Sequence, residues 1–143
     1  MHMKDRKYEL IKLNKVVEAD GSLLVTEVGN RVPFEIKRIF CVKEVKEGCS
    51  RGNHATKKTK LILVPVSGSC KVLVDDGVNK EVFEMNDDRV GLYIDEMIWR
   101  LMYDFTPDCV MMAICDRVFE PGNETYDNYE EFLQAIKDEE DDK

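Results

Sequence analysis

The chain has 143 residues, of which 43% are hydrophobic and 35% are charged, and its formal net charge at pH 7 is −8. This length fits one domain with its own core, and the negative charge argues against general binding to nucleic acid, whose phosphates would be repelled. The longest apolar run, residues 109–115, is far shorter than the roughly 20 residues that cross a bilayer, so no membrane association is expected.

The two ends of the chain are expected to lie outside the folded body. Residues 1–3 read Met-His-Met and resemble a cloning scar, and no apolar signal-peptide core follows them, which favours a cytoplasmic location. Residues 138–143 are strongly acidic and are expected to form a frayed, solvated tail. The five cysteines include no Cys-x-x-Cys pair, so neither a disulfide framework nor a zinc site is indicated.

Short runs rich in β-branched residues recur about every ten residues and predict strands. Turn residues such as Gly, Asn, Asp, Ser and Pro separate the runs, a spacing typical of an all-β sandwich or barrel. The predicted strands are residues 8–13, 23–28, 36–42, 60–66, 70–75, 81–84, 90–94, 100–103 and 109–114.

Three local patterns add detail to this prediction. The strands at 61–66 and 70–74 flank Gly68 and are expected to form a hairpin, and Asp76-Gly77 predicts a tight turn into the next strand. After Asn123, apolar residues fall at helical spacing across 127–137, which predicts a short C-terminal helix packed on the barrel. No linker divides the chain, so residues 1–143 are expected to form one domain.

His54 is the main candidate for chemistry. The chain has two histidines and His2 belongs to the expected scar, so His54 is left as the side chain that can exchange a proton near neutral pH. It lies in a polar segment with Arg51, Lys57 and Lys58, where a cationic patch would suit an anionic ligand. A lone histidine is more often structural, and the neighbouring cations favour the functional interpretation.

Several sequence blocks together resemble the nucleotide-sugar 3,4-ketoisomerases that act on thymidine-diphosphate-linked 4-keto-6-deoxyglucose. They occur in the family's order across nearly the whole chain, and together they are specific although each alone is weak. The blocks are residues 33–40, 51–55, 68–70, 74–77, 90–94, 99–100, 104–105 and 108–112.

This resemblance implies a fold, a ligand and a reaction. The expected fold is a cupin-type double-stranded β-helix, a jelly-roll barrel, that forms a homodimer and binds a thymidine diphosphate sugar inside the barrel. The expected reaction moves the sugar carbonyl from C4 to C3 by removing the C3 proton and protonating C4, as a step of deoxysugar biosynthesis for surface polysaccharide. Such chemistry needs a base with a pKa near neutrality and no cofactor.

The chain departs from the family at the site of the second histidine. The usual His-Ala-His reads His54-Ala55-Thr56 here, so the second proton transfer falls to His54 itself, to Tyr103 or to a water molecule. The loss also fits a protein that binds a nucleotide sugar without isomerising it, or an isomerase or epimerase of a different nucleotide sugar. Arg100 stands where other members have histidine, as in the subset of the family whose product keeps the glucose configuration at C4.

The remaining ligand contacts are assigned from charge and hydrogen-bonding capacity. Arginine suits bidentate contacts to a diphosphate, and Trp99 is a candidate for stacking on the base or sugar, although a lone tryptophan in a β-protein is more often part of the core. One usable histidine cannot supply a cupin metal site, so no metal is expected. The substrate-binding candidates are Arg38, Arg51, Asn53, Thr56, Tyr93, Trp99 and Arg100, with His54 and Tyr103 as the catalytic pair.

Overall fold

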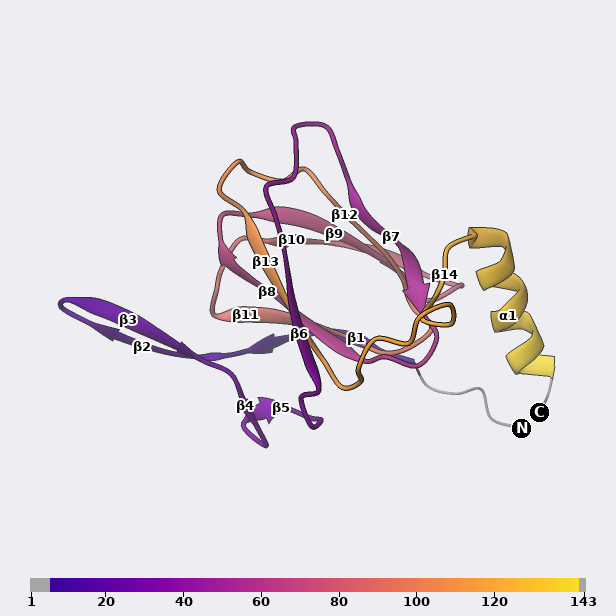
Figure 1. Ribbon diagram of the computed structural model, residues 1–143, viewed down its shortest axis with the longest axis horizontal. Coiled ribbons are helices and arrows are strands. Elements are labelled where there is room, and N and C mark those ends of the chain that lie inside the picture. The colour runs from indigo at the N-terminus through magenta and orange to yellow at the C-terminus, as the bar shows by residue number, and fades with distance from the viewer. Residues whose placement is uncertain (1–5, 142–143) are drawn as a thin grey trace.

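The computed structural model describes residues 6–141, and within them two five-stranded antiparallel sheets face each other (Figure 1). The first sheet has the order β1-β11-β8-β13-β6, formed by Tyr8–Lys12, Val90–Ile94, Leu61–Ser67, Val110–Cys115 and Arg38–Lys43. The second has the order β10-β9-β12-β7-β14, formed by Lys80–Met85, Cys70–Asp75, Trp99–Tyr103, Arg51–Thr56 and Thr125–Tyr126. The all-β prediction is confirmed.

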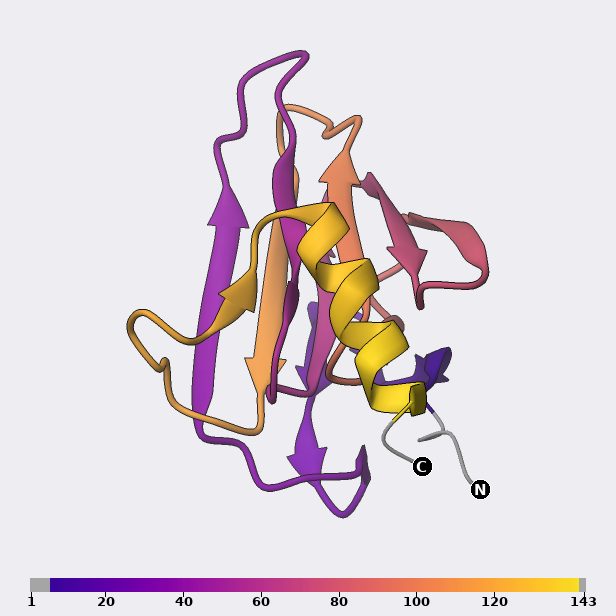
Figure 2. The same ribbon diagram turned by 90° about the vertical axis from the view of Figure 1, so that its right-hand side faces the viewer.

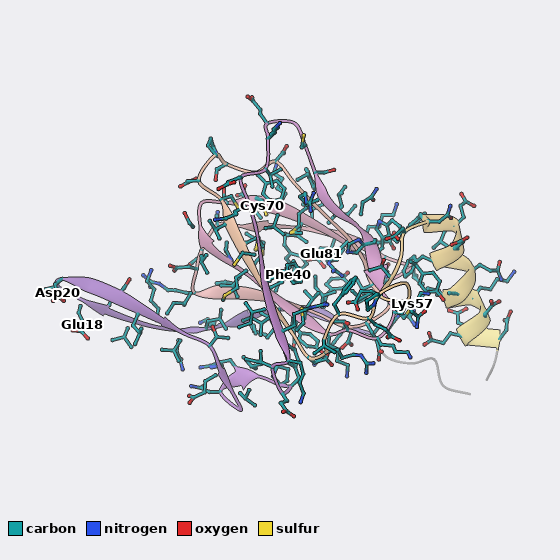
Figure 3. All side chains as sticks on the ribbon, in the orientation of Figure 1. Glu18, Asp20, Phe40, Lys57, Cys70 and Glu81 are labelled. Carbon is teal, nitrogen blue, oxygen red and sulfur yellow. The ribbon has the colours of Figure 1, made fainter. Side chains whose placement is uncertain are left out.

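A separate hairpin extends away from this two-sheet body. It consists of β2 (Asn14–Glu18) and β3 (Gly21–Val25), and its tip carries Glu18 and Asp20 far from the rest of the protein (Figures 1 and 3). The short parallel pair β4 (Glu27–Val28) and β5 (Arg31–Val32) then leads the chain back to the first sheet. The hairpin therefore makes few contacts with its own barrel.

The core explains why β8 is a continuous apolar run. Leu61 and Leu63 point between the two sheets, whereas Ile62 and Val64 point to the outer face of the first sheet. That outer face is covered by the segment 24–36, so both faces of β8 are buried. Burial on both faces removes the apolar–polar alternation that a half-exposed strand would show.

The outer face of the second sheet is covered by α1 (Tyr129–Asp141), which Figure 2 shows lying across the strands. Phe132 and Ile136 are buried against this sheet, and Asn128 caps the helix by accepting a hydrogen bond from the Glu131 amide at 3.0 Å. The predicted helix is confirmed, but it continues to Asp141. Glu139 near its end pairs with the nearly buried Arg6 at 3.2 Å.

This anchoring gives residues 138–141 a helical structure in place of the expected frayed tail. The remaining two residues of that tail, and the expected scar at residues 1–3, lie outside the described part of the chain. No helix within residues 6–141 is both long enough and apolar enough to span a membrane.

Strand positions were predicted better than strand pairing. The expected hairpin around Gly68 is wrong, because β8 pairs with β11 and β13 whereas β9 pairs with β10 and β12. Gly68, with a φ of 63°, instead carries the chain from one sheet to the other. The Asp76-Gly77 turn is confirmed, since β9 and β10 pair across it and the Asp76 carboxylate accepts hydrogen bonds from the turn amides.

Candidate active site

A cavity of about 670 Å³ opens where the edges of the two sheets approach each other. Strand β6 borders it from the first sheet, β7, β12 and β14 border it from the second, and the segment 116–124 closes one side. Its lining residues are Arg38, Phe40, His54, Thr56, Arg100, Phe119, Gly122, Glu124, Thr125 and Asp127.

An irregularity in β7 aims His54 into this cavity. His54 pairs with Arg100 of β12 and Gly52 pairs with Leu101, so Asn53 has no partner in the ladder. Asn53 has a φ of 57° and Gly52 a φ of 91°, which are values typical of a bulge that turns the strand. Beyond the bulge His54 lines the cavity, whereas the next residue, Ala55, faces α1.

The two nitrogens of the His54 ring face opposite charges. Nε2 lies 3.3 Å from Nη2 of Arg100, and Nδ1 lies 3.8 Å from Oδ1 of Asp127. Arginine can only donate, so Nε2 accepts and the neutral ring carries its proton on Nδ1. Burial, followed by the charge of Arg100, lowers the pKa of His54 to about 4 against the opposing effect of Asp127. His54 is therefore neutral, and able to accept a proton, at pH 7.

Arg100 presents a buried donor that has no partner within residues 6–141. The residue is 4% exposed, and its Nη1 makes no hydrogen bond. Burial lowers the pKa of Arg100 to about 10, so the guanidinium is charged at neutral pH. Arg100 lines the cavity, and because an unpaired buried donor costs free energy, its guanidinium is suited to bind an oxygen atom of a ligand there.

Arg38 is held by Glu124, which sequence reasoning did not identify. Nη2 of Arg38 donates to Oε2 of Glu124 at 2.9 Å, and the hydroxyl of Thr59 donates to the same oxygen at 3.1 Å. Burial favours a raised pKa for Glu124, but these hydrogen bonds and one from the Glu120 amide outweigh it and lower the pKa. With Asp127, the cavity thus contains two carboxylates and two guanidinium groups, and the expected cationic patch of Arg51, Lys57 and Lys58 does not line it.

Thr56, the residue in place of the second histidine, has its hydroxyl already engaged. Its side chain is 2% exposed, and Oγ1 donates to the backbone carbonyl of Thr59 at 2.7 Å. Thr56 borders the cavity, but its proton is directed into the protein.

Trp99 and Asn53 lie on the opposite side of the second sheet from His54. Trp99 is buried and packs edge-on against Tyr129 at a centroid distance of 5.2 Å, and its ring is tilted against that of Phe132 at 5.6 Å. Its indole N–H donates to the Asn53 side-chain carbonyl at 3.2 Å. Trp99 therefore belongs to the aromatic cluster beneath the helix, in agreement with its alternative interpretation as a core residue.

Three further predicted contacts also lie away from the cavity lining. Tyr93 is buried on the outer face of the first sheet and donates to Asp95 at 2.5 Å. Arg51 is exposed and lines a neighbouring hollow of about 610 Å³. Tyr103 is three residues from Arg100 on β12, so strand alternation places its side chain on the other face of the sheet.

The structure thus brings together four of the nine predicted residues, namely Arg38, His54, Thr56 and Arg100, and adds six others. Most of the additions come from residues 119–127, where the sequence has no periodicity that would place them at the cavity. Phe40 belongs to a predicted strand, but nothing in the pattern showed which face it would occupy. Within residues 6–141, no group of three or more His, Cys, Asp or Glu side chains is arranged to hold a metal ion.

The two facing sheets form a cupin-type barrel, and the cavity at their margin, lined by a histidine and a buried arginine, is its candidate small-molecule site. The chain belongs to the FdtA family, described as WxcM-like, C-terminal, whose model matches residues 6–137. It is 34% identical over 130 residues to the TDP-4-oxo-6-deoxy-α-D-glucose-3,4-oxoisomerase of Aneurinibacillus thermoaerophilus, covering 90% of this chain and 94% of that protein.

Solved structures agree with this assignment. The chain resembles WlaRA, a TDP-fucose-3,4-ketoisomerase from Campylobacter jejuni, with a TM-score of 0.84 and 32% identity over 90% of this chain and 95% of that one. It also resembles a histidine-to-asparagine variant of the 3,4-ketoisomerase QdtA from Thermoanaerobacterium thermosaccharolyticum in complex with TDP-4-keto-6-deoxyglucose. The TM-score is 0.87 and the identity 30%, over 92% of this chain and 94% of that one. The predicted cupin fold and family are confirmed.

Proposed function

We propose that this protein is a 3,4-ketoisomerase of a TDP-4-keto-6-deoxyhexose, with His54 as the catalytic base. The family supports the reaction class, and the observation that carries the proposal is the pairing of His54 with Arg100 in one cavity. A neutral imidazole beside a charged donor supplies both groups that enolisation of a ketone needs.

The proton transfers follow from this geometry. Arg100 first shifts its hydrogen bond from Nε2 of His54 to the C4 oxygen of the substrate, which frees the lone pair of Nε2. Nε2 then takes the proton from C3, the C3–H electron pair forms the C3–C4 double bond, and the C4 oxygen becomes an oxyanion. The guanidinium of Arg100, which lines the cavity beside His54, donates a hydrogen bond to that oxygen. A proton then moves from the C3 hydroxyl to the C4 oxygen. Finally C4 takes a proton as the C3 carbonyl forms.

His54 is also the group best suited to protonate C4. Thr56 directs its hydroxyl to the Thr59 carbonyl, and Tyr103 is not among the residues that line the cavity. Arg38 is bound to a carboxylate. A single imidazole that takes the C3 proton as imidazolium can return it to the adjacent carbon, so one base serves both steps.

The test is deuterium incorporation at C3 of TDP-4-keto-6-deoxyglucose in deuterated water, followed by NMR. The unaltered protein should incorporate solvent deuterium and form the 3-keto product, whereas His54→Asn should do neither and should still show a thermal shift with TDP. A thermal shift with neither deuterium incorporation nor 3-keto product from the unaltered protein would favour the alternative of a binding protein without isomerase activity. Full turnover by His54→Asn would exclude His54 as the base.

One-base transfer has a stereochemical consequence. In the glucose configuration H3 and H4 lie on opposite faces of the ring, so returning a proton to C4 on the face that H3 left gives the galactose configuration. A substrate deuterated at C3 and turned over in ordinary water should carry part of its label to C4 of a galactose-configured product. A glucose-configured product without label would instead identify a donor on the opposite face, such as water, and would fit the resemblance drawn from Arg100.

We also propose that the protein is a homodimer formed through the β2–β3 hairpin. The hairpin extends from the barrel (Figure 1), and on it Val17 is 63% and Leu23 60% exposed. Strand β1 forms an edge of the first sheet, so no other strand within residues 6–141 pairs with its outer side. Such an edge can pair with a strand of another chain. A second copy would cover both features.

Analytical ultracentrifugation tests the dimer. The unaltered chain should sediment at twice the monomer mass, and Leu23→Lys should shift it towards monomer. Val78→Lys serves as the control, because Val78 is equally apolar and 70% exposed but lies in the turn between β9 and β10. Sedimentation of the unaltered chain as a monomer at micromolar concentration would contradict the proposal.

A further inference from the structure

We propose that Asp127 is a positioning residue for His54, whose carboxylate holds the Nδ1–H of the ring so that Nε2 is the nitrogen that faces the substrate. The inference rests on the proposed function and assigns a role that neither the sequence motifs nor the fold requires. Three features of the structure carry it.

The first feature is where Asp127 lies and how it is held. It follows β14 directly and precedes the first turn of α1, and it lines the cavity together with Thr125. The side chain of Asp127 is 79% exposed, and the Thr125 hydroxyl orients the carboxylate by donating to its Oδ1 at 2.8 Å. The same oxygen lies 3.8 Å from Nδ1 of His54.

That separation is longer than a hydrogen bond, and a shift of less than 1 Å would close it. Hydrogen bonds between catalytic groups are often long in an empty site and shorten when substrate binds. The loop that carries Asp127 borders the cavity that the substrate would fill. A bound substrate would therefore contact the loop whose movement shortens the distance between Asp127 and His54.

The second feature is the partner of the other ring nitrogen. Arg100 approaches Nε2 at 3.3 Å and can only donate a proton to it. The neutral ring must then carry its hydrogen on Nδ1, the nitrogen that lies 3.8 Å from Asp127. The two neighbours thus select the same tautomer from opposite sides of the ring.

The third feature is the set of charges around the ring. Arg51 on the same strand and Arg100 on β12 disfavour the imidazolium ion, whereas Glu124 and Asp127 favour it. Glu124 is already engaged by Arg38 and Thr59. Asp127 is the carboxylate that faces His54 directly, so it opposes Arg100 when the ring accepts the C3 proton.

Asp127→Asn tests this role, because the substitution keeps the shape and removes the charge. Glu130→Gln is the matched control: it removes a charge from an exposed position three residues further on, which does not line the cavity. For Asp127→Asn we expect kcat/KM to fall by about tenfold, less than the roughly 10²–10⁴-fold that an acid–base group itself contributes, because Asp127 acts through His54. The fall should appear mainly in kcat, and Glu130→Gln should match the unaltered protein.

The pH profile distinguishes positioning from a general structural effect. Because Asp127 raises the pKa of His54, its removal lowers that pKa, and the acid limb of kcat/KM should move to lower pH. Thr125→Val, which releases the carboxylate but keeps its charge, should lower kcat with a smaller movement of the limb. If Asp127→Asn changed neither the plateau value of kcat/KM nor the pH of its acid limb, the proposal would be overturned.

Long-range ¹H–¹⁵N NMR of the free protein gives a readout that needs no turnover. Since the chain has two histidines, the His2→Gln variant assigns the His54 signals. We expect a neutral ring protonated on Nδ1, with a lower titration midpoint in Asp127→Asn. An inactive protein that shows this change would refute the proposed function and support the Asp127 contact. An identical titration with and without Asp127 would overturn the contact, whatever the activity.

Discussion

Glu124→Gln should destabilise the protein and thereby measure how strongly the cavity wall depends on the pair formed with Arg38. The two side chains are 20% and 10% exposed for Arg38 and Glu124 and lie 2.9 Å apart. Both carboxylate oxygens accept hydrogen bonds, one from Arg38 and Thr59 and the other from the Glu120 amide. Glutamine keeps only one acceptor oxygen, so in either orientation its NH₂ group faces a donor. Nε of Arg38 already lacks a partner within residues 6–141, so the variant leaves the guanidinium poorly satisfied.

The magnitude follows from the bonds that are lost. A hydrogen bond to a charged group contributes about 1.5–3 kcal/mol, and discounting this pair for its partial exposure gives about 2 kcal/mol at pH 7. Urea unfolding of the unaltered protein, Arg38→Met, Glu124→Gln and the double variant yields the coupling free energy, which should exceed about 1 kcal/mol. Since the folded-state pKa of Glu124 is lowered, the contribution is present above the carboxyl's unfolded pKa and disappears as the pH falls through the folded one.

The chain offers a matched control for this cycle. Lys37 and Glu35 form an ion pair with the same 2.9 Å separation, but their side chains are 48% and 75% exposed. Solvent screening should keep the coupling of that pair below about 0.5 kcal/mol. Equal coupling in the two cycles, or additive effects in the Arg38–Glu124 cycle, would refute the argument that burial makes the cavity pair strong.

Three further predictions concern the base, its neighbour and the core. Because burial and Arg100 lower the pKa of His54 to about 4, kcat/KM should stay level from pH 7 to about pH 5.5, where a histidine of ordinary pKa near 6.5 would be mostly protonated; Arg100→Met should move the acid limb to higher pH. Thr56→Val should cost about 1 kcal/mol in urea unfolding by removing the bond to Thr59, while turnover persists. Met111→Ala, at a fully buried position between the sheets, should cost about 2–5 kcal/mol by the same measurement.

The strands could be predicted where a run of alternating or apolar residues has turn residues at both ends. The bounds of β9 and β11 match their predicted ranges, because alternating or apolar runs there end at clear turn residues. Pairing was not predictable in the same way. The turn at Gly68 has the composition of a hairpin, yet it connects two sheets, because β8 pairs with the distant strands β11 and β13, which no local pattern identifies.

The sequence predicted fewer than half of the residues that line the cavity, because most of them lie outside the predicted strands. Strand β7 was not predicted at all, since a bulge at Gly52 and Asn53 breaks its alternation. His54 was identified from its residue type and the family resemblance. Glu124 and Asp127 enter the cavity from a segment whose path depends on the docking of α1, and no local pattern in the sequence encodes that path.

The position of Arg100 beside His54 connects these observations to the proposed reaction. Its charge keeps the imidazole unprotonated in the free protein, which preserves the base, but it also weakens that base by disfavouring the imidazolium ion that proton abstraction creates. A bound diphosphate brings about two negative charges and would partly offset the arginine. The oxyanion that forms at C4 would offset it further, because it draws the Arg100 donor to itself. The basicity of His54 would then rise with substrate binding, and the acid limb of kcat, which reports the bound state, should lie at higher pH than that of kcat/KM.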